Sequence, residues 1–148
     1  MLDATSRAKV HPLGLHVTFA TLLSLLIGCA STTHIYVQST EKTNHGNTLY
    51  VVVRAVDGKT IGTESYGDVA ANVFTDPMDK SVIRREPIFP GNTMTLTIDD
   101  PGSRDIVLYF FFTDPGQNWR VPLHQPIPAE VYVDLGEHQV ERVQIRKR

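Results

Sequence analysis

The residue whose type and position most clearly indicate a chemical reaction is Cys29, the only cysteine among the 148 residues. A single thiol excludes an internal disulfide and a metal site built from several thiolates. Cys29 follows an apolar run from Leu13 to Ile27, and Arg7 and Lys9 precede that run. A basic segment, a short apolar segment and small residues at its end are typical of a secretory signal. A membrane-spanning helix is the weaker interpretation, because it needs about 20 apolar residues.

The four residues Leu26–Cys29, which include the end of the apolar run, resemble a bacterial lipobox. In precursors with this motif the thiol receives a diacylglycerol, the signal is cut before the cysteine, and the new amine is acylated. Three acyl chains anchor a protein far more strongly than one, because each buried CH₂ contributes about 0.8 kcal/mol. We therefore expect a cleaved signal peptide at residues 1–28, lipidation of Cys29 and an acylated tether at residues 29–33. The alternative is a cysteine buried at the end of a core helix.

The residue after the cysteine carries information on the membrane. Ala30 stands where similar lipoproteins that stay in the inner membrane have Asp. The resemblance therefore implies the outer membrane.

The remaining polar residues show no catalytic or metal-binding spacing. The histidines after Cys29 form no i,i+4 pair and are expected to be scattered on the surface: His34, His45, His124 and His138. The acidic residues favour turns, where their side chains bond backbone amides, as at Asp57, Asp76, Asp99, Asp100 and Asp114. The sequence has no phosphate-binding loop, calcium loop or nucleophile elbow. We expect no enzyme, no metal and no cofactor other than the covalent lipid.

Composition limits the remaining possibilities. The chain has 14 Lys+Arg against 16 Asp+Glu, a net charge of −2, and lacks the basic excess typical of nucleic-acid binding proteins. Its apolar content of 41% is sufficient for a hydrophobic core. The length suits one domain, which we expect at residues 34–148.

Most of this domain has the alternating or β-branched pattern of strands, separated by Pro-Gly, Asp-Pro and Asp-Gly turns. Residues 93–98 alternate strictly, and residues 106–112 are so apolar that they predict a central strand buried on both faces. Short strands at this spacing predict an all-β fold, a two-sheet β-sandwich of seven to eight strands. The expected strands are 35–37, 48–56, 81–88, 93–98, 106–112, 119–123, 130–135 and 140–145.

Two features interrupt this pattern. The apolar residues between Glu64 and Phe74 recur at helical spacing and predict one short helix. Asp57 and Gly58 predict a tight hairpin, with the return strand beginning at residues 60–61.

Trp119, the only tryptophan of the chain, and Arg120 form one conspicuous pair. We expect Trp119 to be a core or edge anchor whose ring is covered by Arg120. A ligand-binding aromatic is the alternative.

From Leu49 to Arg142 the order of segments resembles the outer-membrane lipoprotein of the type VI secretion membrane complex, the TssJ family. The resemblance rests on the lipobox and on five later segments: the loop 43–47, the strand 51–54, the helical stretch ending at Phe74, the turn 90–91 before strand 93–98, and the passage from 106–112 to Trp119-Arg120. It implies a transthyretin-like β-sandwich with a structural role. It also implies a position on the outer membrane facing the periplasm, with several copies in a ring complex.

The resemblance further implies a partner and a binding loop. The partner is the periplasmic C-terminal region of a TssM-like inner-membrane protein. The loop between the first two strands would help to bind it through Thr40, Glu41, Lys42, Thr43, Asn44, His45, Gly46 and Asn47. An ordinary hairpin connection is the alternative for this loop. For the whole protein the alternative is a generic periplasm-facing lipoprotein module that binds a protein, an inhibitor or a glycan.

Overall fold

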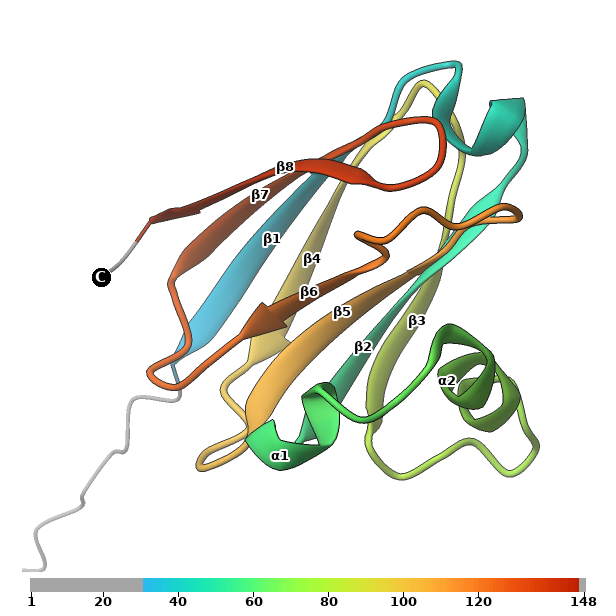
Figure 1. Cartoon of the computed structure of the whole chain (residues 1–148). Helices are drawn as coiled ribbons and strands as arrows, with labels where there is room; N and C mark the ends of the chain where they lie inside the picture. The colour runs from blue at the N-terminus through green and yellow to red at the C-terminus, as the bar shows by residue number, and fades with distance from the viewer. Residues whose placement is uncertain (1–30, 147–148) are drawn as a thin grey trace, which may run out of the picture.

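In a computed structural model, which describes residues 31–146, the chain forms two four-stranded sheets packed face to face (Figure 1). The predicted signal peptide, Cys29 and Ala30 lie outside the described residues. The first sheet has the order β4 (Thr93–Asp99), β1 (Thr32–Gln38), β7 (Glu130–Leu135), β8 (Val140–Arg146). The second has the order β3 (Val82–Ile88), β2 (Leu49–Val56), β5 (Asp105–Phe111), β6 (Arg120–Leu123). The predicted β-sandwich of seven to eight strands is confirmed.

The first sheet buries one face, as its alternating sequence predicts. In β1 the side chains of Ile35 and Val37 are buried while the intervening positions are partly exposed. Ile35 lies opposite Leu96 of β4, which runs antiparallel to β1, and opposite Val131 of β7, which runs parallel to β1. All three side chains belong to the core between the sheets. The pairing of β1 with β7 is the only parallel one in the described part of the molecule, and all remaining pairings are antiparallel.

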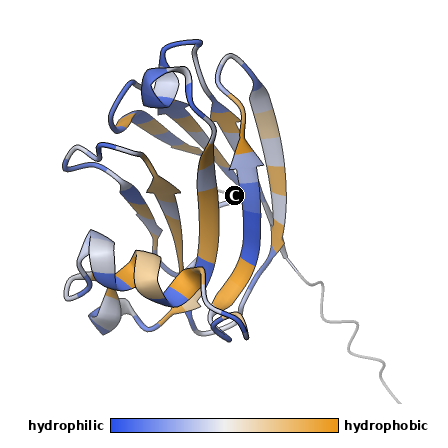
Figure 2. Cartoon of the chain, turned by 90° about the vertical axis from the view of Figure 1, so that its right-hand side faces the viewer, coloured by the Kyte–Doolittle hydropathy of each residue, from blue (hydrophilic) through white to orange (hydrophobic). Residues whose placement is uncertain are grey.

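The second sheet is buried on both faces at its centre. In β5 the side chains of Leu108 and Phe110 enter the core between the sheets, whereas Val107 and Tyr109 enter a second core on the outer face. This double burial explains the continuous apolar sequence of the strand. Residues 106–112 were expected to form a central strand, and the structure confirms it. In Figure 2 hydrophobic and hydrophilic colours alternate along the strands, while the loops at the top end are mainly hydrophilic.

Helices cover the outer face of the second sheet. Helix α2 (Tyr66–Val73) begins at a capping box, in which the Ser65 hydroxyl accepts from the Asp68 backbone N–H and the Asp68 carboxylate accepts from the Ser65 backbone N–H. Val69 and Val73 on its inner face pack into the second core. The helix predicted between residues 64 and 74 is therefore confirmed, but a second one precedes it.

The hairpin predicted at Asp57-Gly58 is wrong. In its place lies a one-turn helix, α1 (Gly58–Ile61), and β2 pairs with β5 and β3 instead of a return strand at residues 60–61. The chain leaves the sheet here because Ile61 and helix α2 supply apolar surface that covers the outer face of β2 and β5. A local turn signal was outweighed by burial of a sheet face that would otherwise meet water.

Trp119 belongs to the second core, with a relative exposure of 9%. Its ring lies against Tyr66, at a centroid distance of 5.1 Å, and against Tyr109, at 5.5 Å. The guanidinium of Arg120 lies 5.1 Å from the centre of the Trp119 ring. The expected core anchor covered by Arg120 is confirmed.

A buried polar network fixes the segment between α1 and α2 to the sheet. Both carboxylate oxygens of Glu64 accept from Arg54, at 2.8 and 3.1 Å, and one accepts from the Tyr109 hydroxyl at 3.0 Å. Arg54 is 6% exposed and also donates to the Ser81 hydroxyl. Burial, and then the charge of Glu64, raises the pKa of Tyr109 to about 12. Among the described residues no buried side-chain N or O atom lacks a hydrogen bond.

Strand β1 begins earlier than its sequence predicts, at Thr32 rather than Ile35. Two residues expected in the tether, Thr32 and Thr33, therefore lie in the strand. Thr33 is fully buried and its hydroxyl donates to the Pro128 carbonyl at 2.8 Å. That hydrogen bond explains why a polar residue ends up inside the fold. No helix within residues 31–146 is long and apolar enough to cross a membrane.

Candidate functional site: the loop end of the sandwich

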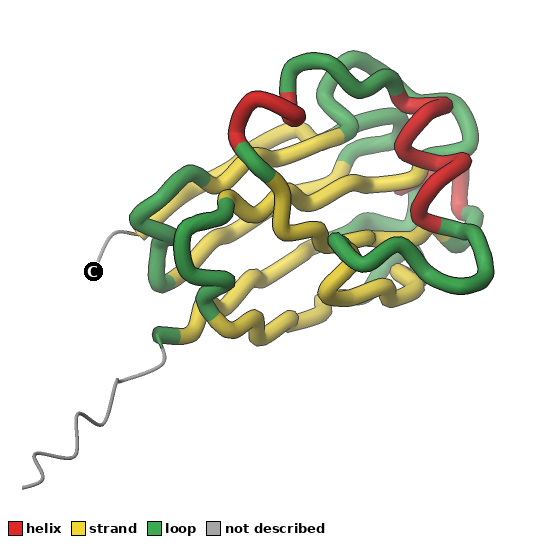
Figure 3. Tube along the Cα trace, turned by 90° about the horizontal axis from the view of Figure 1, so that it is seen from below, coloured by secondary structure: helices red, strands yellow, loops and turns green. Residues whose placement is uncertain are grey.

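The loops gather at the two ends of the strands (Figure 3). At one end the chain enters β1. At the other end four connections meet, namely those between β1 and β2, β3 and β4, β5 and β6, and β7 and β8. We call this second end the loop end, made of residues 39–48, 89–92, 112–119 and 136–139. It holds the whole loop that was expected to bind a partner.

Asn44 ties three of these connections together. Its Oδ1 accepts from the backbone N–H of Thr113 at 2.7 Å, and its own N–H donates to the Glu137 carbonyl at 3.0 Å. Its side-chain amide also donates to the carbonyls of Asn47 and Thr48. With a relative exposure of 1%, Asn44 is a buried polar residue whose partners all lie in loops. It therefore determines how the β1–β2 loop sits on its neighbours.

Thr43 has a similar role. Its hydroxyl donates to the Leu135 carbonyl at 3.1 Å and accepts from the Thr40 N–H at 2.9 Å. The side chain is fully buried. It attaches the loop to the last residue of β7.

The β1–β2 loop folds back through a short left-handed turn. Residues 43–46 form a 3₁₀-type turn, η1 (Thr43–Gly46), in which Asn44 and His45 have φ values of 51° and 54°. Gly46 follows with a φ of 76°. Asn, His and Gly are among the residues that tolerate this region best. The sequence therefore fits the turn, and the turn presents His45 outward.

The structure divides the eight loop residues that the sequence singled out. Thr43 and Asn44 are buried and shape the loop from within. The other six are exposed: Thr40, Glu41, Lys42, His45, Gly46 and Asn47. Only these six present atoms that a partner could contact.

Two histidines that were expected to be scattered meet at the loop end. The rings of His45 and His138 lie edge to face, with centroids 4.5 Å apart. Glu137 joins them, with its carboxylate 3.1 Å from Nδ1 of His45. The two segments are some ninety residues apart in the chain, so no spacing rule finds this cluster. The only signal in the sequence was the presence of unassigned polar residues in two turns.

The opposite end of the sandwich has a different character. A pocket of about 490 Å³ lies there between the β6–β7 connection and β8, lined mostly by apolar groups including Pro122, Ile127 and Ile145. His124 and Asp105 lie beside it, 2.7 Å apart, and the hydrogen bond from His124 lowers the pKa of Asp105. Nothing in this pair resembles a nucleophile with its base.

A family model described as "IglE, N-terminal domain" matches residues 50–135, more than half of the chain. The chain belongs to this family of type VI secretion lipoproteins. Such lipoproteins are structural proteins, so the family confirms the expectation of a non-enzyme that needs no cofactor. No curated protein sequence matches the chain.

Solved structures of type VI lipoproteins share the fold. The lipoprotein TssJ1 of Pseudomonas aeruginosa is 14% identical, with a TM-score of 0.62 over 80% of this chain and 98% of that one. The membrane-bound component Lip of Serratia marcescens is also 14% identical, with a TM-score of 0.58 over 80% and 98%. A chain in a structure described as "T6SS protein TssM C-terminal domain (869-1107) from EAEC" is 13% identical, with a TM-score of 0.57 over 76% and 99%. These likenesses confirm the β-sandwich fold of this lipoprotein.

Proposed function

We propose that this lipoprotein anchors the periplasmic C-terminal part of a TssM-type inner-membrane protein to the outer membrane, as one of several copies in a ring. Its membership of a type VI secretion lipoprotein family carries the proposal. The fold and the layout of its two ends support it. Each copy would contribute a weak contact, and several copies on one assembly would bind with higher avidity.

The similarity to a chain in the TssM fragment structure supports this choice of partner. The match covers 99% of that chain but only 76% of this one, so the matched chain is shorter than this protein. The named fragment, residues 869–1107, is longer than this protein. We therefore infer that the matched chain is not the TssM fragment itself but a second protein in the same structure, with the fold of this protein.

The start of β1 supports an upright orientation on the membrane. Ser31 is attached to the sandwich, since its carbonyl accepts from the Asp100 N–H at 2.8 Å and its hydroxyl donates to the Asp100 carboxylate at 2.9 Å. Only Ala30 separates Ser31 from Cys29, a span of at most about 7 Å between Cα atoms. A lipid on Cys29 would therefore hold this end of the sandwich at the membrane and direct the loop end into the periplasm.

This orientation gives the two classes of loop residues separate roles. The exposed residues at positions 40–42 and 45–47 would contact the partner. The buried Thr43 and Asn44 would hold them in place, because they bond to three neighbouring segments. Glu41 and Lys42 are the clearest contact candidates, since both residues are exposed. Within residues 31–146 their side chains make no hydrogen bond or ion pair, and only the backbone carbonyl of Lys42 accepts one, from the N–H of His45.

The test measures binding of the purified lipoprotein in detergent to the periplasmic C-terminal fragment of the TssM-type protein from the same cells. Replacing Glu41→Ala and Lys42→Ala together should weaken binding about tenfold or more, equivalent to about 1.4 kcal/mol. Asp57→Ala with Lys59→Ala is the matched control, because it removes one acid and one base at the opposite end of β2. The control should change affinity by less than about twofold.

Two outcomes would contradict the proposal. If both double variants weakened partner binding equally, the loop end would have no specific role in binding. Absence of binding by the unaltered protein would favour the alternative, a generic periplasm-facing binding module. The apolar pocket near Ile127 is the feature that such a module would use.

Anchoring is tested separately at Cys29. Cys29→Ser should move the protein from the outer-membrane fraction to the soluble periplasmic fraction or leave it as an uncut precursor. The sandwich should unfold at the same temperature as before, because the core between the sheets is built from residues that follow Cys29, from Ile35 onward. An unchanged, fully processed protein in the outer-membrane fraction would contradict lipidation at this residue.

A further inference from the structure

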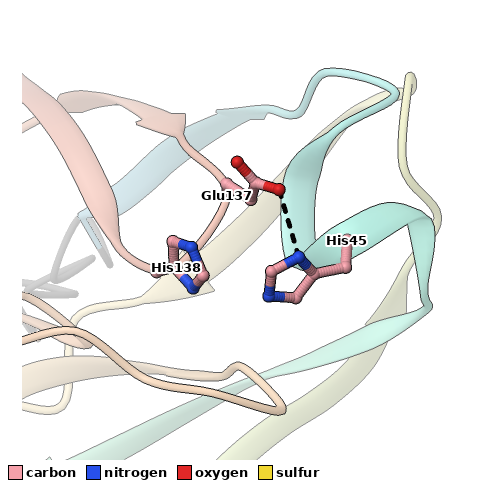
Figure 4. A group of neighbouring side chains, drawn as sticks. All are labelled: His45, Glu137 and His138. Carbon is pink, nitrogen blue, oxygen red and sulfur yellow. Dashed lines mark ion pairs between the residues drawn. The ribbon is translucent and has the colours of Figure 1, made fainter.

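His45, Glu137 and His138 bring three metal-ligand atoms to one point of the loop end (Figure 4). One ligand atom from each side chain lies within 4.8 Å of the other two. His45 comes from η1, and the other two come from the β7–β8 hairpin. Two imidazoles and one carboxylate are a ligand set that Zn²⁺ favours.

The backbone of both segments is held where these side chains originate. His45 directly follows the buried Asn44, whose N–H donates to the carbonyl of Glu137 at 3.0 Å. The carbonyl of His138 accepts from the N–H of Gly116 at 2.8 Å. The three side chains are therefore mounted on two turns that are joined by the hydrogen bond between Asn44 and Glu137. Their meeting is a consequence of the fold and not of long side chains reaching across solvent.

The distances suit a small ion after modest movement of the side chains. Zinc bonds of about 2.0–2.2 Å at tetrahedral angles place ligand atoms about 3.3–3.6 Å apart. Nδ1 of His45 and a carboxylate oxygen of Glu137 are already 3.1 Å apart. All three side chains are roughly half exposed. Rotation of these side chains can close the remaining gap without disturbing the core.

Asp114 orients the second histidine. Nδ1 of His138 lies 3.3 Å from the Asp114 carbonyl and 3.5 Å from its carboxylate. An N–H that donates to this residue leaves Nε2 as the nitrogen with a free lone pair. Metal-binding histidines in proteins are commonly oriented by such a hydrogen bond from the other ring nitrogen.

We propose that His45, Glu137 and His138 bind a zinc ion that joins the β1–β2 loop to the β7–β8 hairpin. All three protein ligands of the ion come from this chain, so zinc binding can be tested without the partner. Lipoproteins of this family need no cofactor, and the fold has its own core, so the ion adds a link between two loops without being required for folding. Three protein ligands leave a fourth tetrahedral position open to water.

The test titrates Zn²⁺ into the full chain in detergent, by calorimetry, with Cys29→Ser in every sample so that no thiol competes. One ion should bind per chain and raise the unfolding temperature. His45→Asn, which keeps a residue suited to the left-handed turn, and His138→Gln should each weaken binding at least about tenfold. Glu137→Gln should also weaken binding. Mg²⁺ and Ca²⁺, which prefer oxygen ligands, should not bind at this site.

His124→Gln is the matched control, because His124 also pairs with a carboxylate, Asp105, but has no second histidine beside it among residues 31–146. This variant should bind zinc like the parent protein. The proposal is overturned if the parent protein does not bind zinc, or if the His45 and His138 variants bind it as tightly as the parent. Loss of binding in the His124 variant would equally overturn it, since it would locate the ion at the other end. None of these outcomes depends on whether the TssM-type partner is bound.

Discussion

The network around Glu64 and the cluster around Glu137 contain similar groups in opposite surroundings. Glu64 lies beneath the helices, where Arg54 and Tyr109 saturate its carboxylate. Its side chain is 16% exposed. The Glu137 side chain is 49% exposed, and its partner His45 is 44% exposed. A carboxylate with a basic partner thus occurs both inside the fold and at its loop end.

This difference indicates what each group contributes. A buried charge without partners is very costly, so the inner carboxylate is surrounded by donors and has little capacity left for an outside ligand. The exposed carboxylate keeps water as an alternative partner, so its ion pair contributes little to stability but its oxygen atoms remain available. The inner network therefore secures the helices, and the outer cluster is suited to binding.

The largest effect is expected for Trp119→Ala, in the second core beside the inner network. Removal of this ring should reduce the free energy of unfolding by about 3–5 kcal/mol, because a buried aromatic leaves a cavity. Urea unfolding followed by circular dichroism measures it. A loss below about 1 kcal/mol would show that the residues packed on the outer face of the second sheet do not form a stabilising core.

Glu64→Ala should come next, with a loss of about 3 kcal/mol. The variant leaves the charge of Arg54 buried without its partner, and an unpaired buried charge accounts for most of such losses. The double variant Arg54→Met with Glu64→Leu is the control, since it removes both charges and should recover much of the stability. If the double variant is less stable than Glu64→Ala, the ion pair itself and not the unpaired charge accounts for the loss.

Glu64 should also be visible in the titration of Tyr109. The folded pKa of about 12 lies above the ordinary tyrosine pKa of 10.0, so this tyrosine contributes stability that is present below pH 10 and lost as the pH rises through 12. Glu64→Gln should lower the pKa of Tyr109 only in part, because burial is the larger cause. Ultraviolet titration of the phenolate checks the sign.

At the loop end, Asn44→Ala is expected to cost about 2 kcal/mol. It leaves the backbone N–H of Thr113 without its acceptor and places alanine in a left-handed conformation. It should also weaken binding of the partner and of zinc, because the loop loses its attachment. Asn44→Asp, which keeps the Oδ1 acceptor, should recover part of the stability in the same urea assay.

The smallest effect is expected for Arg142→Ala on β8. Its ion pair with Asp134 is short, yet the arginine side chain is 65% exposed. Surface pairs of this kind contribute about 0–1 kcal/mol. Thermal unfolding should change by no more than a few degrees. If Arg142→Ala lost as much unfolding free energy as Glu64→Ala, exposed and buried ion pairs would contribute equally to stability, and the comparison would fail.

Most of the strands could be predicted because the pattern of apolar residues in a strand indicates whether one or both of its faces are buried. Residues 93–98 alternate since only one face meets the core, and residues 106–112 are continuously apolar since both faces are covered. The hairpin prediction at Asp57-Gly58 failed because these two residues favour a local turn but do not determine what the chain forms after it. Whether the chain returns as a strand or leaves as a helix depends on distant residues, such as Val107 and Tyr109, that need to be covered.

The sequence by itself predicted the β-sandwich, and it contains the apolar run of residues 13–27 before a lone cysteine and the loop proposed to bind a partner. These properties reside in local order and periodicity, which short-range contacts preserve. Only the tertiary structure decided that Thr43 and Asn44 face inward, and that His45 meets Glu137 and His138. The physical reason is that the two turns are brought together by packing and by one buried hydrogen bond between Asn44 and Glu137, and neither depends on spacing along the chain.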